Sequence, residues 1–359
     1  MPAQTQLAIP LSSGELPFAP FPRTRYQGSK LKLVPWISAR LEGLPFRTVL
    51  DAFGGSGCIS HALKVQGKAV TYNDLLSFNC EIGRALVEND HVRLDAEDVA
   101  FLVSRHASRD YDDFVERTFR GVFFLDEENR WIDTVAQNIG ELKNPYKKAL
   151  AFFALFQAAL VKRPYNLFHR ANLSLRLADV RRTFGNKTTW DTPFVTHFER
   201  FAREASRAVV QGSRPCRATC GEALDVPGQY DLVYLDPPYA RRPGVGVNYL
   251  DYYHFLEGLT DYGAWNEQID RSRKHLPLRH QRDAWSRGDD LVGAFEQLFE
   301  RYRRSIIVVS YRSDGVPDEL TLTRLLRRVK RDVRLHRAGR YQYALSRNSS
   351  SEELLFVAT

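Results

Sequence analysis

The tetrapeptide DPPY at 236–239 carries the strongest chemical signal in the sequence. It follows an apolar segment typical of a buried strand. Its prolines fix the backbone at the carboxyl edge of a sheet, where open α/β sheets bind ligands. Asp236 offers one hydrogen-bond acceptor, the carbonyl of Pro237 offers a second, and Tyr239 offers an aromatic face. A proline-rich turn that only closes a strand is the structural alternative.

Two acceptors side by side suit the exocyclic amine of a nucleobase. Such an amine is a poor nucleophile because its lone pair is delocalised into the ring. Acceptors aimed at its hydrogens favour a more sp³-like nitrogen whose lone pair can point at a methyl donor. Tyr239 could stack on the base and hold it outside the duplex. The motif therefore indicates methyl transfer to an amine.

A glycine-rich segment, DAFGGSG at 51–57, follows another predicted strand. Gly54, Gly55 and Gly57 lack a Cβ, so a cofactor could approach the backbone closely. The segment has neither the GxxxxGK[ST] of a P-loop nor the GxGxxG of a dinucleotide site. What remains is an adenosyl cofactor, with Asp74 as acceptor for its ribose hydroxyls. A tight turn, and a helix N-cap at Asp74, are the structural alternatives.

The elements that must position these residues form a doubly wound parallel sheet. A strand, a glycine loop, a helix and a second strand follow one another between residues 47 and 74. After a long interruption, the strand pattern resumes near residue 216. The predicted strands are 47–53, 68–74, 216–223, 230–239 and 305–312. The end of the chain, with VRLHRAGR at 333–340, YQYALSR at 341–347 and EELLFVAT at 352–359, is predicted to form two terminal strands joined by a Ser/Asn-rich turn. The predicted helices beside them are Cys58–Val65, Leu250–Asp261, Asp289–Arg303 and 318–329.

Residues 80–215 interrupt the alternation and are predicted to be an inserted, largely helical module. Helices are expected at Glu97–Ser104 and Lys147–Val161. A strand-like pair is expected at Ala171–Leu177 and Thr188–Trp190, with an FGN turn between them. Basic and aromatic residues mix from Lys162 to Arg176. The predicted division is a flexible leader (1–21), a catalytic domain (22–79 and 216–359) and a target-recognition region (80–215).

The charge of the chain favours an anionic partner. The net charge is +8 and the isoelectric point is about 9.3. Residues 271–347 hold 19 Lys and Arg against 9 Asp and Glu, which exceeds the surplus of the whole chain. A solvated basic surface is the alternative, but beside a nucleotide-modifying site phosphate binding is the better explanation.

Other features limit the class of protein. The four cysteines, Cys58, Cys80, Cys216 and Cys220, form no CxxC pair, which predicts buried, reduced thiols. Half a metal site at Cys216 and Cys220 is the alternative; no second pair has suitable spacing, so no metal is expected. The longest apolar run, Ala149–Val161, is shorter than the ~20 residues that a bilayer requires. The N-terminus does not resemble a signal peptide. We therefore expect a cytoplasmic protein without membrane contact.

The motifs together resemble the Dam-like family of N(6)-adenine-specific DNA methyltransferases, in the motif order called alpha. YQGSKLKL at 26–33 is similar to the family's N-terminal YxGSKxKL motif. DAFGGSG resembles its cofactor loop, Asp74 its ribose acceptor, and DPPY its catalytic motif. Glu222 stands where a carboxylate commonly contacts the cofactor's adenine, within GEA rather than GDA. The likeness covers residues 22–359, loosely between 80 and 160. It extends to NYLDYYHFLEGL at 248–259, SYRSDGVP at 310–317 and YALSRNSSSEELLF at 343–356.

The resemblance implies a fold and a set of site residues. The fold would be the Rossmann-like sheet of S-adenosylmethionine-dependent methyltransferases, with seven strands and a reversed terminal hairpin. Lys30 would lie near the methionine part of the cofactor. The catalytic residues would be Asp236, Pro237, Pro238 and Tyr239. The cofactor-binding residues would be Tyr26, Gly28, Ser29, Lys30, Asp51, Phe53, Gly54, Gly55, Gly57, Asp74, Glu222 and Ala223. The DNA-binding residues would be Lys162, Arg163, Asn166, Arg170 and Asn172.

The predicted function is site-specific methylation of adenine. A methyl group would pass from S-adenosyl-L-methionine to the exocyclic amine of an adenine flipped out of double-stranded DNA, in a prokaryote or phage. A cognate restriction endonuclease is a candidate partner, and oligomeric state stays open. One alternative is a catalytically silent DNA-binding or regulatory module on the same fold. Another is an amino methyltransferase that acts on cytosine or RNA.

Overall fold

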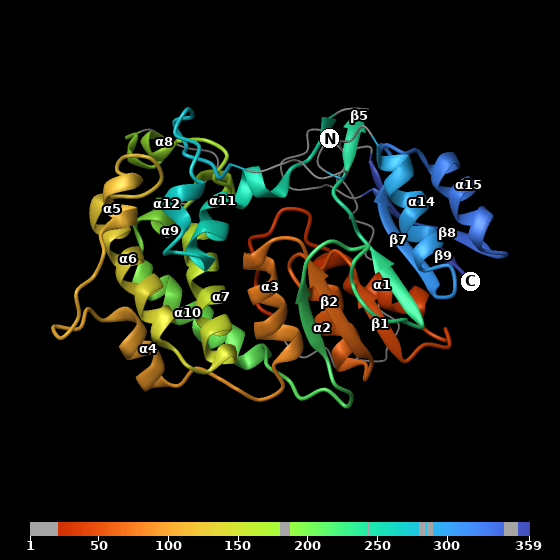
Figure 1. Cartoon of the computed structure of the whole chain (residues 1–359), viewed down its shortest axis with the longest axis horizontal. Helices are drawn as coiled ribbons and strands as arrows, with labels where there is room; N and C mark the ends of the chain where they lie inside the picture. Colours follow the sequence, from red (N-terminus) through yellow and green to blue (C-terminus); the bar gives the residue numbers. More distant parts are fainter. Residues whose placement is uncertain (1–20, 180–186, 243–244, 280–284, 286–289, 341–350) are drawn as a thin grey trace, which may run out of the picture.

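The computed structural model describes residues 21–179, 187–242, 245–279, 285, 290–340 and 351–359. A seven-stranded sheet fills one side of the molecule, and a helical body fills the other (Figure 1). The strand order is β3-β2-β1-β4-β7-β9-β8. The strands are β1 (Thr48–Asp51), β2 (Ala69–Asp74), β3 (Arg217–Cys220), β4 (Leu232–Leu235), β7 (Ile306–Arg312), β8 (Val333–Arg340) and β9 (Glu352–Ala358). β5 (Ala240–Arg242) and β6 (Val245–Gly246) pair separately.

The sheet is parallel except for its last strand. β3, β2, β1, β4 and β7 run in one direction, and β9 runs antiparallel to both β7 and β8. This arrangement confirms the predicted seven strands with a reversed terminal hairpin, and it is consistent with a Rossmann-like methyltransferase sheet. Because parallel strands end at one edge, Asp51, Asp74 and Asp236 come together although they are far apart in the sequence.

Helices cover both faces of the sheet, and successive residues of the central strands face opposite layers. Leu232 and Tyr234 of β4 pack in one hydrophobic cluster, with α1 and α2. Val233 and Leu235 of β4 pack in another, with α14 and α15. Both faces of these strands are buried, which explains their continuous apolar runs. The helices are α1 (Val34–Leu41), α2 (Cys58–Val65), α14 (Leu291–Arg301) and α15 (Glu319–Val329), with α3 (Ser77–Gly83) following β2.

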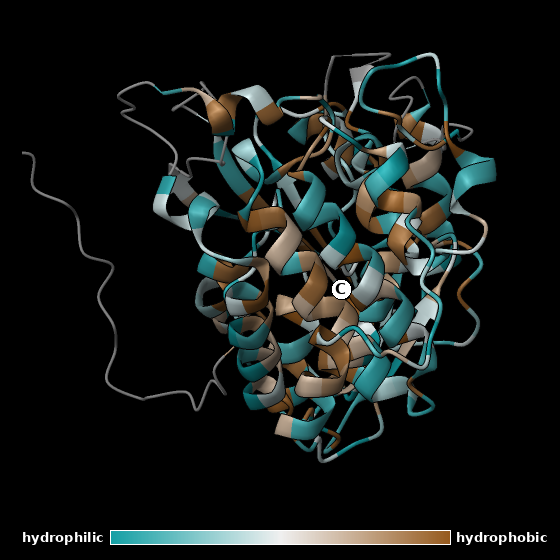
Figure 2. Cartoon of the chain, turned by 90° about the vertical axis from the view of Figure 1, so that its left-hand side faces the viewer, coloured by the Kyte–Doolittle hydropathy of each residue, from teal (hydrophilic) through white to brown (hydrophobic). Residues whose placement is uncertain are grey.

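The helical body has its own hydrophobic core. α7 is buried along most of its length, and α10 lies against it with Phe194, Phe198 and Phe201 turned inward. On the side of this body that Figure 2 shows, the helices have hydrophilic residues next to hydrophobic ones. Its helices are α4 (Ala96–Val103), α5 (Phe114–Thr118), α6 (Asp126–Glu141), α7 (Pro145–Val161), α8 (Leu173–Leu177), α9 (Lys187–Asp191), α10 (Phe194–Ala208), α11 (Tyr249–Thr260) and α12 (Trp265–Gln268).

The body extends beyond the predicted recognition region. α11 and α12 follow the catalytic strand β4, yet Tyr253, Phe255 and Trp265 belong to the hydrophobic core of the helical body. α11 also contacts α3, so this helix connects the helical body with the sheet. The structure therefore places residues from both sides of the DPPY motif in one helical unit.

The predicted strand pair at 171–177 and 188–190 is wrong. Both segments are short helices, α8 and α9, and the FGN segment between them lies outside the described residues. Leu173, Leu175 and Leu177 alternate as they would in a strand, but the buried residues are Leu173 and Arg176, which have helical spacing. Arg176 donates two hydrogen bonds of 2.8 Å to Glu128 of α6. This tertiary contact decides the conformation of a segment too short to have a clear period.

The prediction that all four cysteines are reduced is also wrong. Cys80 and Cys220 form a disulfide with a Cα–Cα distance of 5.6 Å, while Cys58 and Cys216 are free. The register of β2 and β3 sets Asp74 opposite Cys220, and α3 returns Cys80 to the same place. Sheet pairing, which sequence spacing does not reveal, brings the two sulfurs together.

Two predicted segments lie beyond the part of the chain that the structure describes. The leader at 1–21 lies outside the described residues except for Phe21, and so does YQYALSR at 341–347. Within the part of the chain that the structure describes, every helix is too short or too polar to cross a lipid bilayer.

Candidate active site

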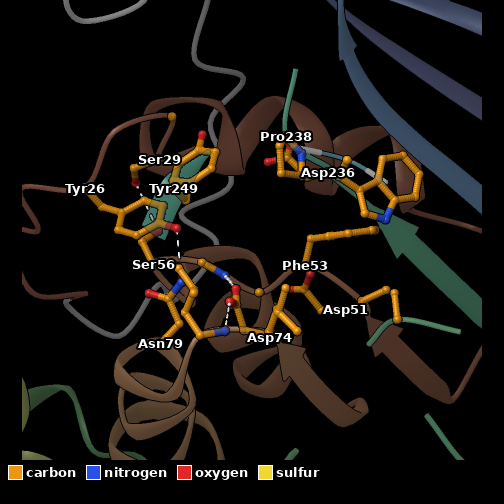
Figure 3. Close-up of a pocket in the computed structure, with 18 of the residues that line it drawn as sticks. Tyr26, Ser29, Asp51, Phe53, Ser56, Asp74, Asn79, Asp236, Pro238 and Tyr249 are labelled. Carbon is orange, nitrogen blue, oxygen red and sulfur yellow. Dashed lines mark hydrogen bonds between the residues drawn. The ribbon is translucent and has the colours of Figure 1, made fainter. Parts of the chain in front are cut away.

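A cavity of about 320 Å³ lies at the carboxyl edge of the sheet. It is bordered by the segment before α1 and by the loops that follow β1, β2, β3 and β4. Figure 3 shows Asp74 and Asp236 on opposite sides of this cavity, with Phe53 between them. The predicted site residues that line it are Tyr26, Gly28, Ser29, Lys30, Asp51, Phe53, Gly54, Gly55, Asp74, Glu222, Ala223, Asp236, Pro238 and Tyr239. Gly57 and Pro237 are not among the lining residues.

The glycine loop is held close against β2. The Gly54 N–H donates to the carbonyl of Asn73 over 2.8 Å, and the Tyr72 hydroxyl donates to the carbonyl of Gly55 over 2.8 Å. A Cβ on Gly54 would lie 2.1 Å from the ring of Tyr72, so this position excludes any side chain. Gly57 precedes α2 with φ of 76°, a left-handed conformation that favours glycine. The loop is therefore a tight turn that also forms one wall of the cavity.

Asp74 anchors this loop at the end of β2. Its Oδ2 accepts a hydrogen bond of 2.9 Å from the Gly55 N–H, and its Oδ1 accepts one of 3.0 Å from the Leu76 N–H. The N-cap of α3 is Leu76, so Asp74 is not a helix cap. Burial raises the pKa of Asp74, while the hydrogen bond from Leu76 acts in the opposite direction. The carboxylate is thus positioned for contact with a ligand in the cavity.

Asp51 is a buried acid with unused hydrogen-bonding capacity. It is 1% exposed, and its Oδ2 accepts a hydrogen bond of 2.7 Å from Ser60. Its buried Oδ1 has no well-formed hydrogen bond to any described residue. Burial, together with the charges of Asp236 and Asp74, raises the pKa of Asp51 to about 7, while hydrogen bonds from Ser60 and the Phe53 backbone act in the opposite direction. A cationic ligand would satisfy this oxygen.

Aromatic rings close the side of the cavity next to the helical body. Tyr26 stacks on Tyr249 and Tyr253 of α11, with ring centroids 5.8 and 5.2 Å apart. Its hydroxyl accepts a hydrogen bond of 3.1 Å from Asn79 of α3. Ser29 lies 3.1 Å from Ser56 of the glycine loop, oxygen to oxygen. The N-terminal motif therefore connects the loop with α11.

Asp236 belongs to a buried cluster of charged and hydroxyl groups. The Lys30 ammonium donates to its Oδ1 over 2.9 Å, and the Tyr239 hydroxyl donates to the same atom over 2.7 Å. Lys30 also donates to the Tyr239 hydroxyl. Lys30 is 3% exposed and lies 3.4 Å from Glu353 of β9. The DPPY motif is thus tied to the N-terminal motif and to the last strand.

Two predicted residues have surroundings that the sequence did not suggest. Lys30, expected near the cofactor's methionine part, lines the cavity, but its ammonium lies at Asp236 and Tyr239. Tyr239, expected to present an aromatic face, is 8% exposed and packs edge-on against Tyr311 at 5.1 Å.

Glu222 is exposed at the other end of the cavity. Ala223 beside it is buried, and its carbonyl accepts a hydrogen bond of 2.9 Å from Tyr302.

Several residues at the cavity were missed by sequence reasoning. Glu257 accepts hydrogen bonds of 2.9 and 3.0 Å from the backbone N–H groups of Ser77 and Phe78, which begin α3. Asn79 and Tyr249 also line the cavity, whereas Glu353 lies outside its lining, 3.4 Å from Lys30. The segments around residues 249 and 353 had been singled out as family-like, which was the only available signal. Their side chains reach the site through tertiary packing.

The predicted DNA-binding residues fall into two groups. Lys162 is buried with Glu128 at 2.6 Å. Arg163 is 1% exposed and donates to the carbonyls of Leu167, Phe123 and Arg170 and to the Asn172 side chain. Such engaged, buried groups cannot reach a base edge, which contradicts this prediction for Lys162, Arg163 and Asn172. Arg170 is exposed and Asn166 is partly exposed.

Comparison with known proteins agrees with this geometry. Residues 26–275 match the D12 class of N6 adenine-specific DNA methyltransferases. The type II methyltransferase M2.HphI of Haemophilus parahaemolyticus is 29% identical over 326 residues, which cover 87% of this chain and 90% of that protein. The type II methyltransferase M.NlaIII of Neisseria lactamica is 23% identical over 302 residues, which cover 81% and 84%. The chain therefore belongs to the D12 class of N6 adenine-specific DNA methyltransferases, and it is an adenine DNA methyltransferase.

Proposed function

We propose that the cavity binds S-adenosylmethionine and that Asp236 receives the exocyclic amine of an adenine extruded from double-stranded DNA. The observation that carries this proposal is the position of Asp236, held by Lys30 and Tyr239 at the wall of the cavity opposite Asp74. Methyltransferases of this class generally use S-adenosylmethionine. One cavity thus offers a cofactor site at one end and an amine acceptor at the other.

The residues present fit this cofactor. Among the described residues, five carboxylates line the cavity, which suits a ligand with a net positive charge: those of Asp51, Asp74, Glu222, Asp236 and Glu257. S-adenosylmethionine has a positively charged sulfonium and an ammonium group. Asp74 would accept hydrogen bonds from the ribose hydroxyls, and the buried Oδ1 of Asp51 would interact with positive charge. When bound, the cofactor supplies an electrophilic methyl group.

The chain's own contribution to catalysis is orientation and electrostatic complementarity. Asp236 would accept a hydrogen bond from the target amine, which favours a nitrogen whose lone pair is available for attack. As the nitrogen gains its new bond it becomes more positive, so the negative charge of Asp236 stabilises the transition state more than the ground state. Asp236 also stands where it can accept the proton that the nitrogen then loses.

DNA recognition is proposed for the helical body and the basic C-terminal part. Arg170 and Asn166 are accessible in the segment that Arg163 holds in place, and both side-chain types can bond base edges bidentately. Arginines within 271–347 would bind phosphates, which position the duplex without reading its sequence. Because the relatives are named type II methyltransferases, we also propose a cognate restriction endonuclease and a cytoplasmic location on DNA.

Transfer of tritium from labelled S-adenosylmethionine to DNA tests the proposal. Wild-type protein should label adenine, and Asp236→Ala should lower the rate by several orders of magnitude, because electrostatic stabilisation is often the largest catalytic term. Calorimetry should show cofactor affinity largely retained in Asp236→Ala. Near wild-type turnover in this variant would refute the role of Asp236. Absence of cofactor binding to the wild-type protein would refute the role of the cavity.

A further inference from the structure

Glu353 is a buried acid at the catalytic cluster that comes from the last strand of the sheet. Its side chain is 0% exposed, and its Oε1 lies 3.4 Å from the Lys30 ammonium. The same oxygen accepts a hydrogen bond from the Ser310 hydroxyl of the neighbouring strand β7. β9 and β7 are paired at this point, with Ser310 opposite Leu355 and Arg312 opposite Glu353. The position of Glu353 is therefore set by the sheet itself.

A buried carboxylate at this position destabilises the folded protein unless it has a charged or hydrogen-bonding partner. A buried ion destabilises the folded state by several kcal/mol when it has no partner. The adjacent residue on the same strand, Glu352, has a side chain that is 33% exposed and an ion pair of 3.1 Å with Arg337 on the surface. Of these two adjacent residues, Glu352 therefore forms an ion pair on the surface, whereas Glu353 contacts Lys30, which in turn contacts Asp236 of the DPPY motif.

We infer that Glu353 is a positioning residue for methyl transfer, acting through Lys30 on Asp236. This inference rests on the proposed role of Asp236 as acceptor for the target amine. Lys30 lies between two carboxylates, 2.9 Å from Asp236 and 3.4 Å from Glu353. The ammonium is therefore shared, and Asp236 is only partly neutralised by its contact with Lys30.

This sharing has two consequences for Asp236. First, two carboxylates around one ammonium leave a net negative charge in the cluster, which strengthens Asp236 as an acceptor for an amine that becomes positive. Second, Glu353 holds Lys30 from the side away from the cavity. The hydrogen bonds from Lys30 and Tyr239 both end on Oδ1 of Asp236, which leaves Oδ2 to the substrate. Without Glu353, the whole charge of Lys30 would act on Asp236.

Replacing Glu353 by glutamine tests the inference. Glu353→Gln keeps the size and the hydrogen bond with Ser310 but removes the charge. We expect the single-turnover rate of methyl transfer to fall about 10- to 100-fold, the effect of losing one charge-assisted interaction. The dissociation constants for S-adenosylmethionine and for DNA should stay unchanged, because Glu353 is not among the residues that line the cavity. Glu352→Gln, on the same strand, is the matched control and should retain the wild-type rate.

A role limited to stability predicts a different pattern. It would lower the melting temperature while the rate per folded molecule stayed at the wild-type level, and this result would overturn the inference. In a Lys30→Met background, Glu353→Gln should cause no further loss of rate, because its effect passes through Lys30. A loss that adds to that of Lys30→Met would also overturn it.

Two further variants keep the test decisive. If Glu353→Gln does not fold, Glu353→Asp retains the charge but withdraws the carboxylate from Lys30. A slower rate with unchanged cofactor affinity would support the inference, and an unchanged rate would overturn it. Asp236→Ala separates the two proposals: if it retains activity, the proposed role of Asp236 fails first. If it is inactive while Glu353→Gln is fully active, only the inference about Glu353 fails.

Discussion

The Tyr239 hydroxyl donates a hydrogen bond of 2.7 Å to Oδ1 of Asp236, so the last residue of the DPPY motif holds the first one in place. The ring of Tyr239 is nearly perpendicular to that of Tyr311, and the Lys30 ammonium lies 4.9 Å from its centre. The sequence had suggested a ring for stacking on a base. The structure adds a polar role, because the hydroxyl connects two charged side chains.

This contact changes what is expected of substitutions at Tyr239. Tyr239→Ala should reduce methyl transfer more than Tyr239→Phe, because alanine loses both the ring and the hydroxyl. Tyr239→Phe should still lower the single-turnover rate by about tenfold, since a hydrogen bond to a charged group contributes roughly 1.5–3 kcal/mol. Tyr230→Phe is the control, because the Tyr230 hydroxyl donates to the carbonyl of Pro227. This variant should retain the wild-type rate. Wild-type turnover in Tyr239→Phe would show that the hydroxyl has no role.

The cofactor site can be tested at Asp74 and Gly55. Asp74→Ala should weaken S-adenosylmethionine binding by about 10- to 100-fold, because a charged acceptor for the ribose is lost. Gly55→Val should weaken it as well, since Gly55 has φ of 50° and a Cβ there would lie 3.1 Å from the ring of Tyr26. Isothermal titration calorimetry measures both effects.

These two variants need a stability control. Asp74 also accepts hydrogen bonds from the Gly55 and Leu76 N–H groups, so its loss should lower the melting temperature. Affinity is therefore compared at a temperature where each variant is folded by circular dichroism. Asp110→Ala, at an exposed position of the helical body, should change neither quantity. Unchanged affinity in both site variants would refute the proposed pocket.

The pKa of Asp51, raised to about 7 by burial, predicts pH-dependent cofactor binding. As pH rises through 7, Asp51 becomes ionised, and a cationic ligand favours that form. Affinity for S-adenosylmethionine should therefore increase from pH 6 to pH 8, with release of a proton on binding. S-adenosylhomocysteine, which lacks the sulfonium charge, should show a weaker dependence. Calorimetry in buffers of different ionisation enthalpy measures the released proton.

The Asp51→Asn variant tests the role of this carboxyl group. Its affinity for S-adenosylmethionine should depend less on pH, because the titrating group is absent. Stability provides a second readout. The folded-state pKa is above the unfolded value, so the contribution of Asp51 to the free energy of unfolding is present at low pH and is lost as pH rises toward about 7. Asp51→Asn should remove that loss in the cofactor-free protein. An identical pH profile in wild type and variant would contradict the assignment.

The two groups of predicted DNA-binding residues should behave differently. Arg170→Ala should alter the ranking of DNA sequences in a binding assay while the melting temperature stays unchanged, because Arg170 is exposed. Arg163→Met should instead lower the melting temperature, because Arg163 joins four acceptors inside the helical body. Unchanged stability in Arg163→Met would contradict its structural role. Unaltered sequence preference in Arg170→Ala would place base reading elsewhere.

Phosphate binding is tested on α15, where Arg324, Arg327 and Arg328 are exposed. Neutralising all three should weaken binding to every sequence alike and reduce the slope of log affinity against log salt, since fewer counterions are released. Arg328 has an ion pair with Glu296, so Arg328→Gln alone should have the smallest effect. A slope equal to that of the wild type would show that α15 does not contact the duplex.

The chemistry of the site could be predicted from local sequence because the residues of each motif restrict its backbone conformation. DPPY after an apolar strand, and glycines after another, have few conformations that fit their residues. The parallel sheet followed from the same strands, since their apolar runs require burial on both faces. In the structure, 14 of the predicted catalytic and cofactor-binding residues line one cavity.

The surroundings of those residues depend on contacts between distant segments, which sequence spacing does not specify. The position of Lys30 beside Asp236, the approach of Glu353 from β9, and the joining of Cys80 to Cys220 all follow from strand pairing and helix packing. Arg163 was misjudged for the same reason. A basic residue within an aromatic segment is compatible with DNA contact and with a buried support, and only the fold decides between them. Local sequence thus determined which groups can do the chemistry, while tertiary packing decided which of them are charged partners, which are supports and which reach the surface, because burial and pairing are properties of the folded chain.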